Sequence, residues 1–163
     1  VALYEILAQG ALKFFLLKVD PKKLMLFNPE ESIQFHGNTG PFIQYTFARI
    51  SAVLRKAAEL QIDYKSFDIH KLHGYHETVT PIIFLINSFH MLIEEAAETY
   101  SPSVIAQFVY ELAKEYNRFY TEETILKEPD ENYLKFKVAF SAMVAKTIHQ
   151  SMEVLGIVVP ERM

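Results

Sequence analysis

Residues 37–49 read Gly-Asn-Thr-Gly-Pro-Phe-Ile-Gln-Tyr-Thr-Phe-Ala-Arg, a tight polar turn that leads directly into a helix. Pro41 suits the first helical position, where its missing N–H has no partner to lose. Thr39 or Asn38 can cap the free backbone amides beside it. A helix with so definite a start must bury one of its sides. The pattern of its side chains therefore predicts what the rest of the chain packs against.

The side chains of this helix divide into two faces when they are placed about 100° apart. The predicted core face consists of Ile43, Phe47, Ile50, Leu54 and Ala57. A separate sector, which we call the aromatic and arginine stripe, consists of Phe42, Tyr45, Arg49 and Lys56. Residues three, four and seven apart share one side of a helix, so the stripe is continuous and lies off the core face.

Two interpretations of the aromatic and arginine stripe are open from the residues alone. Its rings can stack on a flat ligand while a guanidinium donates to the ligand's edge, as proteins do with a splayed-out RNA base. In the other interpretation, Phe42 and Tyr45 pack under a neighbouring helix and Arg49 only extends to solvent. The second is the commoner use of aromatic side chains at helical spacing.

The remaining segments also predict helices. Residues 1–18 form an apolar helix that ends at Asp20-Pro21. Two short extended segments, 24–27 and 32–35, are predicted on either side of Asn28-Pro29. Further helices are expected at 78–100, from Ser101-Pro102 to 120, and at 132–155 before Gly156. Helices of this length with short links predict an all-α antiparallel bundle.

The composition excludes several classes of protein. The 163 residues include no cysteine, which rules out disulfides, thiolate metal sites and a cysteine nucleophile. The chain starts at Val1 without a signal-peptide pattern, and we expect a cytoplasmic chain taken from a longer protein. The most apolar segment, 81–93, is short and contains Asn87, Ser88 and His90, so no membrane role is expected.

Charge is distributed unevenly along the chain. The net charge of −4 argues against broad, non-specific binding of nucleic acid. Residues 1–60 nevertheless carry seven basic and five acidic side chains, whereas residues 61–163 carry nine basic and fifteen acidic ones. The basic excess lies in the half that contains the aromatic and arginine stripe. This charge distribution is compatible with a local contact with RNA, but it argues against a protein that coats RNA along its length.

Three histidines, His70, His73 and His76, stand three residues apart in the polar connection between the first and second bundle helices. Imidazoles at that spacing can converge on one metal ion. Gly74 interrupts the segment, however, and one strand of a loop rarely supplies every ligand. A solvated loop is the favoured interpretation, and no metal site is predicted.

Residues 37–49, continued by Ser-Ala-Val-Leu-Arg-Lys at 51–56, resemble the arginyl-tRNA synthetase segment that joins the catalytic domain to the anticodon-binding helices. Residues 101–120 resemble the middle helix of the DALR-type anticodon-binding domain of that family, and residues 155–163 resemble its terminal tail. The resemblance implies a helical anticodon-binding domain at 37–163. It also implies that residues 1–36 are the end of the catalytic domain and the connection from it.

The resemblance implies a pocket that reads the middle base of arginine anticodons, which is always C. The implied anticodon-binding residues are Phe42, Tyr45, Arg49, Tyr120 and Met163 with its terminal carboxylate. Arg55, Lys56, Asn117 and Arg118 are the expected phosphate contacts. On ordinary grounds Tyr120 could instead cover the core, and Met163 could be a frayed terminus.

Two positions depart from the family pattern. Phe42 stands where many members have tyrosine, so it keeps the ring and lacks the hydroxyl. Lys137 stands where the last helix usually carries an arginine, which makes a bidentate pair there doubtful.

The catalytic motifs of this class I synthetase family, of the His-Ile-Gly-His and Lys-Met-Ser-Lys types, do not occur in the 163 residues. By resemblance, the parent is a monomeric arginine–tRNA ligase that uses ATP and magnesium, and its catalytic domain lies elsewhere in the same chain. The present chain alone is expected to be inactive and to need no cofactor. Two alternatives are a helical protein-interaction scaffold that binds no RNA and a regulatory metal-binding bundle that uses the histidines.

Overall fold

The computed structural model describes residues 2–72 and 77–163, and within those ranges it contains helices and no strand. The predicted all-α class is confirmed. The helices are α1 (Leu3–Leu17), α2 (Pro29–Ser32), α3 (Gly40–Glu59), α4 (Val79–Thr99), α5 (Ser103–Glu122) and α6 (Glu131–Val154), with short 3-10 helices η1 (Tyr64–Ser66) and η2 (Ile69–Lys71).

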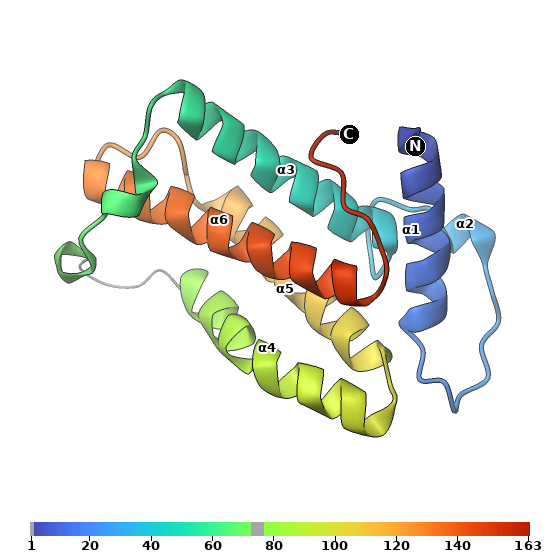
Figure 1. Cartoon of the computed structure of the whole chain (residues 1–163). Coiled ribbons are helices and arrows are strands. Elements are labelled where there is room, and N and C mark those ends of the chain that lie inside the picture. The colour runs from blue at the N-terminus through green and yellow to red at the C-terminus, as the bar shows by residue number, and fades with distance from the viewer. Residues whose placement is uncertain (1, 73–76) are drawn as a thin grey trace.

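The four long helices α3 to α6 pack into one bundle, and α1 stands across the end of the bundle where α3 begins (Figure 1). Helix α4 runs along α5, and α3 runs along α6. After α6 the chain turns back, so the C-terminal tail lies over the first half of α3 and close to α1 (Figure 1). One end of the bundle therefore brings together α1, α3 and the tail.

The start of α3 follows the predicted turn closely. Thr39, rather than Asn38, caps the helix, because its hydroxyl oxygen accepts a hydrogen bond from the Phe42 N–H at 3.3 Å. The same hydroxyl donates to the Gln34 carbonyl at 2.5 Å. Lys18 at the end of α1 donates to the Asn38 carbonyl at 3.0 Å. The turn is thus joined to α1 as well as to its own helix.

The prediction of two extended segments on either side of Asn28-Pro29 is wrong. Residues 24–27 have no regular structure, and Pro29–Ser32 is the short helix α2. The Asn28 side chain accepts hydrogen bonds from the N–H groups of Glu30 at 3.1 Å and Glu31 at 3.3 Å. Asn28-Pro29 is therefore a cap followed by a proline in the first helical turn, which starts a helix and not a turn between strands.

The predicted core face of α3 is buried, except that Leu54 is only half-buried. It meets an aromatic group from α5 and α6, in which the Phe119 ring lies 5.7 Å from Tyr116 and 5.3 Å from Phe140. The Tyr116 hydroxyl donates to Ser141 Oγ at 3.0 Å, and Ser141 donates to the Lys137 carbonyl at 2.8 Å. Burial raises the pKa of Tyr116, so the phenol stays protonated as a donor.

Replacing Tyr116 by phenylalanine is expected to lower the free energy of unfolding by about 0.5–1.5 kcal/mol, the net value of one buried hydrogen bond. The ring keeps its packing, so the denaturant m-value should not change. Urea unfolding of the wild type and the Tyr116→Phe variant measures both quantities. A loss above about 3 kcal/mol would mean that the hydroxyl does more than hold Ser141.

Helix α4 is the most exposed of the long helices. It packs on α5 with the Phe89 ring stacked on Phe108 at 5.0 Å, yet Val79 and Ile82 are its only fully buried residues. By length and composition alone it could cross a membrane, and 11% of its most apolar window is buried. It is longer than the apolar segment 81–93 on which the membrane prediction rested. That no membrane is involved stays a prediction.

Candidate nucleic-acid interface

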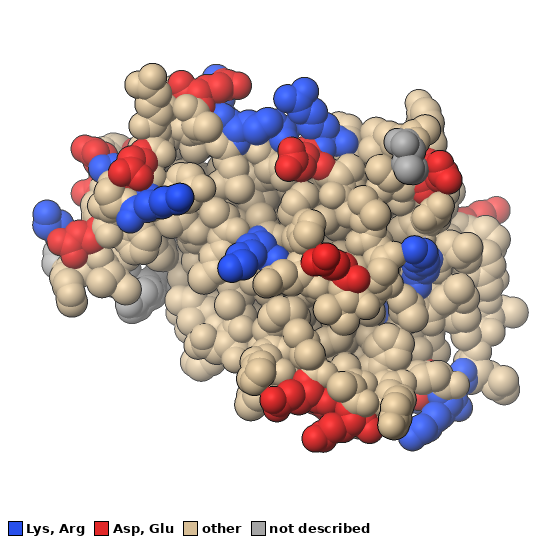
Figure 2. All heavy atoms as spheres, in the orientation of Figure 1, with Lys and Arg blue, Asp and Glu red and all other residues tan. Residues whose placement is uncertain are grey.

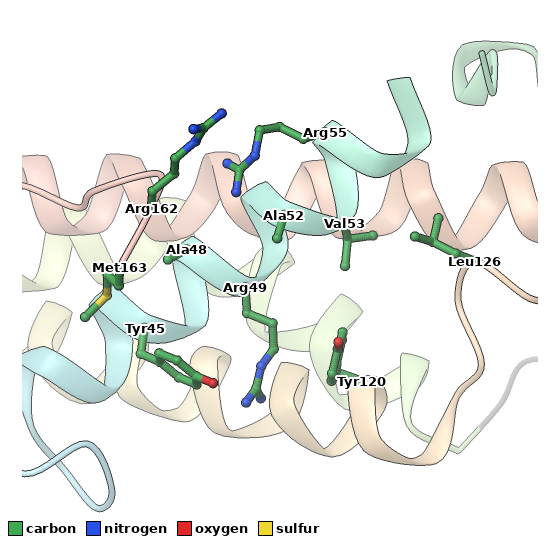
Figure 3. A pocket seen from close by; sticks show the side chains of 10 residues that line it. All are labelled: Tyr45, Ala48, Arg49, Ala52, Val53, Arg55, Tyr120, Leu126, Arg162 and Met163. Atoms are coloured by element: carbon green, nitrogen blue, oxygen red, sulfur yellow. The ribbon is translucent and has the colours of Figure 1, made fainter. Parts of the chain in front are cut away.

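A hollow of about 660 Å³ lies where α3, the end of α5, the α5–α6 loop and the C-terminal tail meet (Figure 3). It is lined by Tyr45, Ala48, Arg49, Ala52, Val53, Arg55, Tyr120, Leu126, Arg162 and Met163. The elements that form it are distant in sequence, and only the folded bundle brings them together. Its volume is in the range of sites for small organic groups.

The guanidinium of Arg49 lies between two aromatic rings inside this hollow. It is 4.8 Å from the centre of the Tyr45 ring and 4.9 Å from the centre of the Tyr120 ring. Both distances are within the range of cation–π attraction. Tyr45 and Tyr120 are 42% and 38% exposed, so each ring keeps surface that a ligand can cover. Tyr45, Arg49 and Tyr120 thus offer a ligand two partly exposed rings and a cation between them.

Asn117 sets the position of Arg49 from behind. Arg49 Nη1 donates to Asn117 Oδ1. The amide of Asn117 in turn donates to Thr46 Oγ1 at 2.7 Å and to the Ala113 carbonyl at 2.8 Å. Since Thr46 is fully buried, the arginine is held by a chain of hydrogen bonds that reaches into the core. A guanidinium has five N–H donors, and its others can serve a ligand.

The C-terminal tail forms one wall of the hollow. Ile157 and Val159 are buried, and Arg55 Nη1 donates to the Glu161 carbonyl at 2.9 Å. Arg162 and Met163 follow and line the hollow. The tail is thus packed against the bundle through its last residues, and Met163 is 40% exposed beside Tyr45 (Figure 3).

The structure does not bring all the expected RNA contacts to the hollow. Phe42 is half-buried, with its ring 5.8 Å from that of Tyr110 on α5, and it does not line the hollow. The exposed Lys56 pairs with Glu59 at 2.8 Å, and Arg118 pairs with Glu122 at 3.0 Å. Phe42 therefore packs under a neighbouring helix, which is the second of the two interpretations of the stripe, because α5 covers this part of it. Asn117 holds Arg49 and is not a free surface amide.

Five residues that line the hollow are not predicted from the sequence: Ala48, Ala52, Val53, Leu126 and Arg162. Ala48 and Ala52 lie one and two turns along the same side of α3 as Tyr45, and their small side chains leave the space that the hollow occupies. Two alanines beside the aromatic and arginine stripe could have indicated an open space on this side of the helix. Leu126 and Arg162 carry no such signal, because the loop and the tail reach the hollow only through the fold.

Positive charge gathers at the rim of the hollow. In Figure 2 Lys and Arg atoms group along the edge of the molecule where α3 and the tail lie. Arg55 and Arg162 extend side by side above the hollow (Figure 3). Arg55 belongs to the basic part of the chain, residues 1–60, whereas Arg162 belongs to the acidic part, and the fold of the C-terminal tail brings it to the hollow.

Of the histidine triplet, the structure describes only His70, which does not line the hollow. His70 is exposed in η2, while His73 and His76 lie outside the described residues. Among residues 2–72 and 77–163, the side chains of His, Asp and Glu form no group of three that could hold a metal ion.

Lys137 holds the loop that carries Leu126. Its ammonium lies 2.8 Å from a Glu123 oxygen and 2.7 Å from a Glu128 oxygen, and its side chain is 3% exposed. Burial alone would lower the pKa of Lys137, but its hydrogen bonds to both glutamates outweigh that effect and raise it. In place of the bidentate pair that the lysine made doubtful, one ammonium bridges two carboxylates.

The loop held by Lys137 should be sensitive to acid. The hydrogen bond from Lys137 lowers the pKa of Glu128 below its ordinary value of 4.5, so this carboxylate stabilises the fold above that value and loses the contribution as pH falls through its lowered folded pKa. Glu128→Gln is expected to cost about 1–3 kcal/mol at pH 7 and progressively less towards pH 3. Urea unfolding across that range checks it, and a pH-independent difference would contradict it.

The helical bundle is the part of the chain that matches a known protein family. Residues 43–163 match the family described as the DALR anticodon binding domain. The chain belongs to that family. The DALR match begins inside α3 and includes every element that lines the hollow, whereas α1 and the turn before α3 lie outside it.

Relatives of this DALR domain chain are named arginine–tRNA ligase. One from Bacteroides thetaiotaomicron is 51% identical over 98% of the chain, and one from Amoebophilus asiaticus is 48% identical over 99% of it. The chain spans 26% and 27% of these two proteins, about a quarter of the length of the curated relatives that it matches. The family suggested by the sequence is confirmed.

Solved structures agree with this assignment. The arginyl-tRNA synthetase of Thermus thermophilus shares 28% identity with a TM-score of 0.85, over 97% of the chain and 27% of that protein. The synthetase of Plasmodium falciparum gives the same TM-score of 0.85 at 22% identity, over 99% of the chain and 28% of that protein. The second likeness shows the shared fold alone.

Proposed function

We propose that the hollow between α3, α5 and the tail binds the middle base of an arginine anticodon. The observation that carries this proposal is the Arg49 guanidinium held between Tyr45 and Tyr120. Stacking on exposed aromatic rings is how proteins hold an unstacked RNA base, and a fixed guanidinium beside the rings can read the edge of that base.

Cytosine is the base whose edge suits this site. Its Watson–Crick edge offers a carbonyl and a ring nitrogen as acceptors, and an amino group as donor. Arg49 supplies donors for the acceptors, and a backbone carbonyl supplies an acceptor for the amino group. Uracil has a carbonyl and an N–H where cytosine has the amino group and the nitrogen acceptor, so it presents the wrong pattern to both partners.

The rim supplies the contacts that do not depend on sequence. Arg55 and Arg162 lie where the phosphates of a loop entering the hollow would pass, and guanidinium groups pair well with phosphate. Lys56 and Arg118 are farther out and already paired with glutamates, so we assign them a weaker part. Asn117 positions Arg49, and we assign Phe42 to packing.

We extend the proposal to the longer protein that the relatives suggest. In it, residues 37–163 position arginine tRNA while a catalytic domain in the same chain joins arginine to the tRNA, with ATP and magnesium, in the cytoplasm. The 163 residues contain none of the family's catalytic motifs. They are therefore expected to bind tRNA without charging it.

Binding of a fluorescein-labelled arginine anticodon stem–loop, followed by anisotropy at several salt concentrations, tests the proposal. We expect saturable binding with a log–log salt slope of about −1 to −2, since Arg55 and Arg162 are the main phosphate contacts at the rim. The Tyr45→Ala variant should bind at least about tenfold more weakly, because it loses one stacking ring. A folded wild-type chain that binds the stem–loop no better than polyuridine would contradict the proposal.

The alternative is a protein-interaction scaffold. Its support is the exposed apolar surface of α4, where Phe84 and Met91 are 70% and 64% exposed. A scaffold would show no preference among RNA loops, and substitutions at Tyr45 and Arg49 would leave its partner binding unchanged. The same anisotropy titration separates the two functions.

A further inference from the structure

Helices α1 and α3 touch through their backbones at two glycines. A Cβ atom on Gly40 would lie 2.4 Å from the Gly10 carbonyl oxygen, a distance that real Cβ atoms do not reach. Any side chain at Gly40 would therefore push the helices apart. This close crossing places α1 directly beside the first turns of α3.

Gln44 fills the space next to this crossing and is fully buried. Its Nε2 donates to the Ile6 carbonyl of α1 at 3.2 Å and to the Val158 carbonyl of the tail at 2.8 Å. Gly10 makes room for it, because a Cβ there would lie 2.4 Å from the same Nε2. One side chain of α3 thus joins α1 to the C-terminal tail.

The tail is held at three points before it reaches the hollow. Lys13 Nζ of α1 donates to the Gly156 carbonyl at 2.6 Å, Gln44 holds Val158, and Arg55 holds Glu161 at 2.9 Å. The first point belongs to α1, and the second is shared with it. Arg162 and Met163, which line the hollow, come directly after the third.

We propose that Gln44, together with Lys13 of α1, positions the C-terminal wall of the RNA-binding hollow. The proposal rests on the proposed function of that hollow. It gives α1 a part in RNA recognition, although α1 lies outside residues 43–163 that match the family. Gln44 is a positioning residue, because it faces α1 and the tail while its neighbour Tyr45 lines the hollow.

Order in the tail, measured without RNA, tests the first step. Gln44→Leu keeps the approximate volume and removes the donor, and Lys13→Met removes the other contact, which comes from an exposed side chain. In both variants the ¹⁵N heteronuclear NOE of Val158, Val159 and residues 161–163 should fall while that of α5 stays unchanged. Lys146→Met, at an exposed lysine of α6, is the matched control. An unchanged tail in folded Lys13→Met and Gln44→Leu would overturn the proposal.

A double-mutant cycle with the stem–loop tests the second step. Deleting Arg162 and Met163 and introducing Gln44→Leu should each weaken binding about 5- to 10-fold, and both changes together should weaken it no more than the deletion alone. Losses that multiply would show that Gln44 does not act through the tail. If the wild type fails to bind the stem–loop, the proposed function fails, while the NOE values still decide whether α1 orders the tail.

Discussion

Replacing Arg49 by alanine is expected to weaken binding of the arginine anticodon stem–loop by about 1–3 kcal/mol, or about 5- to 150-fold. Arg49 is the one side chain that both rings and Asn117 hold in place, so its donors need no ordering when the base arrives. Anisotropy with the wild type and the Arg49→Ala variant measures the loss.

Two further variants show whether charge or geometry is responsible for that loss. Arg49→Lys keeps the charge but lacks the planar set of donors, so it should bind nearly as weakly as Arg49→Ala. Lys56→Ala removes a positive charge from the same helix outside the hollow and should change affinity less than about threefold. If Arg49→Lys restored full binding, the hollow would be an electrostatic contact and not a reader of the base.

Replacing Lys137 by alanine is expected to lower the free energy of unfolding by about 3–5 kcal/mol, because removing one partner of a buried ion pair leaves buried charge behind. The Lys137 side chain is 3% exposed, and those of Glu123 and Glu128 are 9% and 19% exposed. Urea unfolding at pH 7 measures the effect. The loop that carries Leu126 should loosen with it, so stem–loop binding should weaken as well.

Lys135 provides the matched control two residues away on α6. It pairs with Glu131 at 2.6 Å, but that glutamate is 78% exposed. Lys135→Ala should therefore cost less than about 1 kcal/mol, as exposed pairs do. Equal losses for the two variants would mean that burial of the Lys137 cluster has no special effect on stability.

The helices were predictable because their signals are local. Proline and a capping side chain mark the start of α3, and regular apolar spacing marks its core face. The segment before it was not predictable in the same way. Leu24–Phe27 alone looks like a strand, but a strand needs a partner, and the Asn28 cap turns the next residues into a helix.

The lining of the hollow was predictable where one helix determines it. The spacing of Tyr45 and Arg49 put them together off the core, and the resemblance to the family added Tyr120 and Met163. Phe42 belongs to the aromatic and arginine stripe, but its ring packs on Tyr110 of α5. This contact could not be predicted, because the sequence of α3 does not determine where α5 lies. The role of Gln44 could not be predicted for the same reason, because its partners Ile6 and Val158 lie 38 and 114 positions away in the sequence.

The proposed reading of the middle base is tested most directly with two arginine anticodon stem–loops that differ only in having C or U at that position. We expect the wild-type chain to bind the C loop at least about tenfold more tightly, and Arg49→Ala to remove most of this preference. Equal affinity of the folded wild type for the two loops would contradict the claim that the hollow between Tyr45, Arg49 and Tyr120 reads this base.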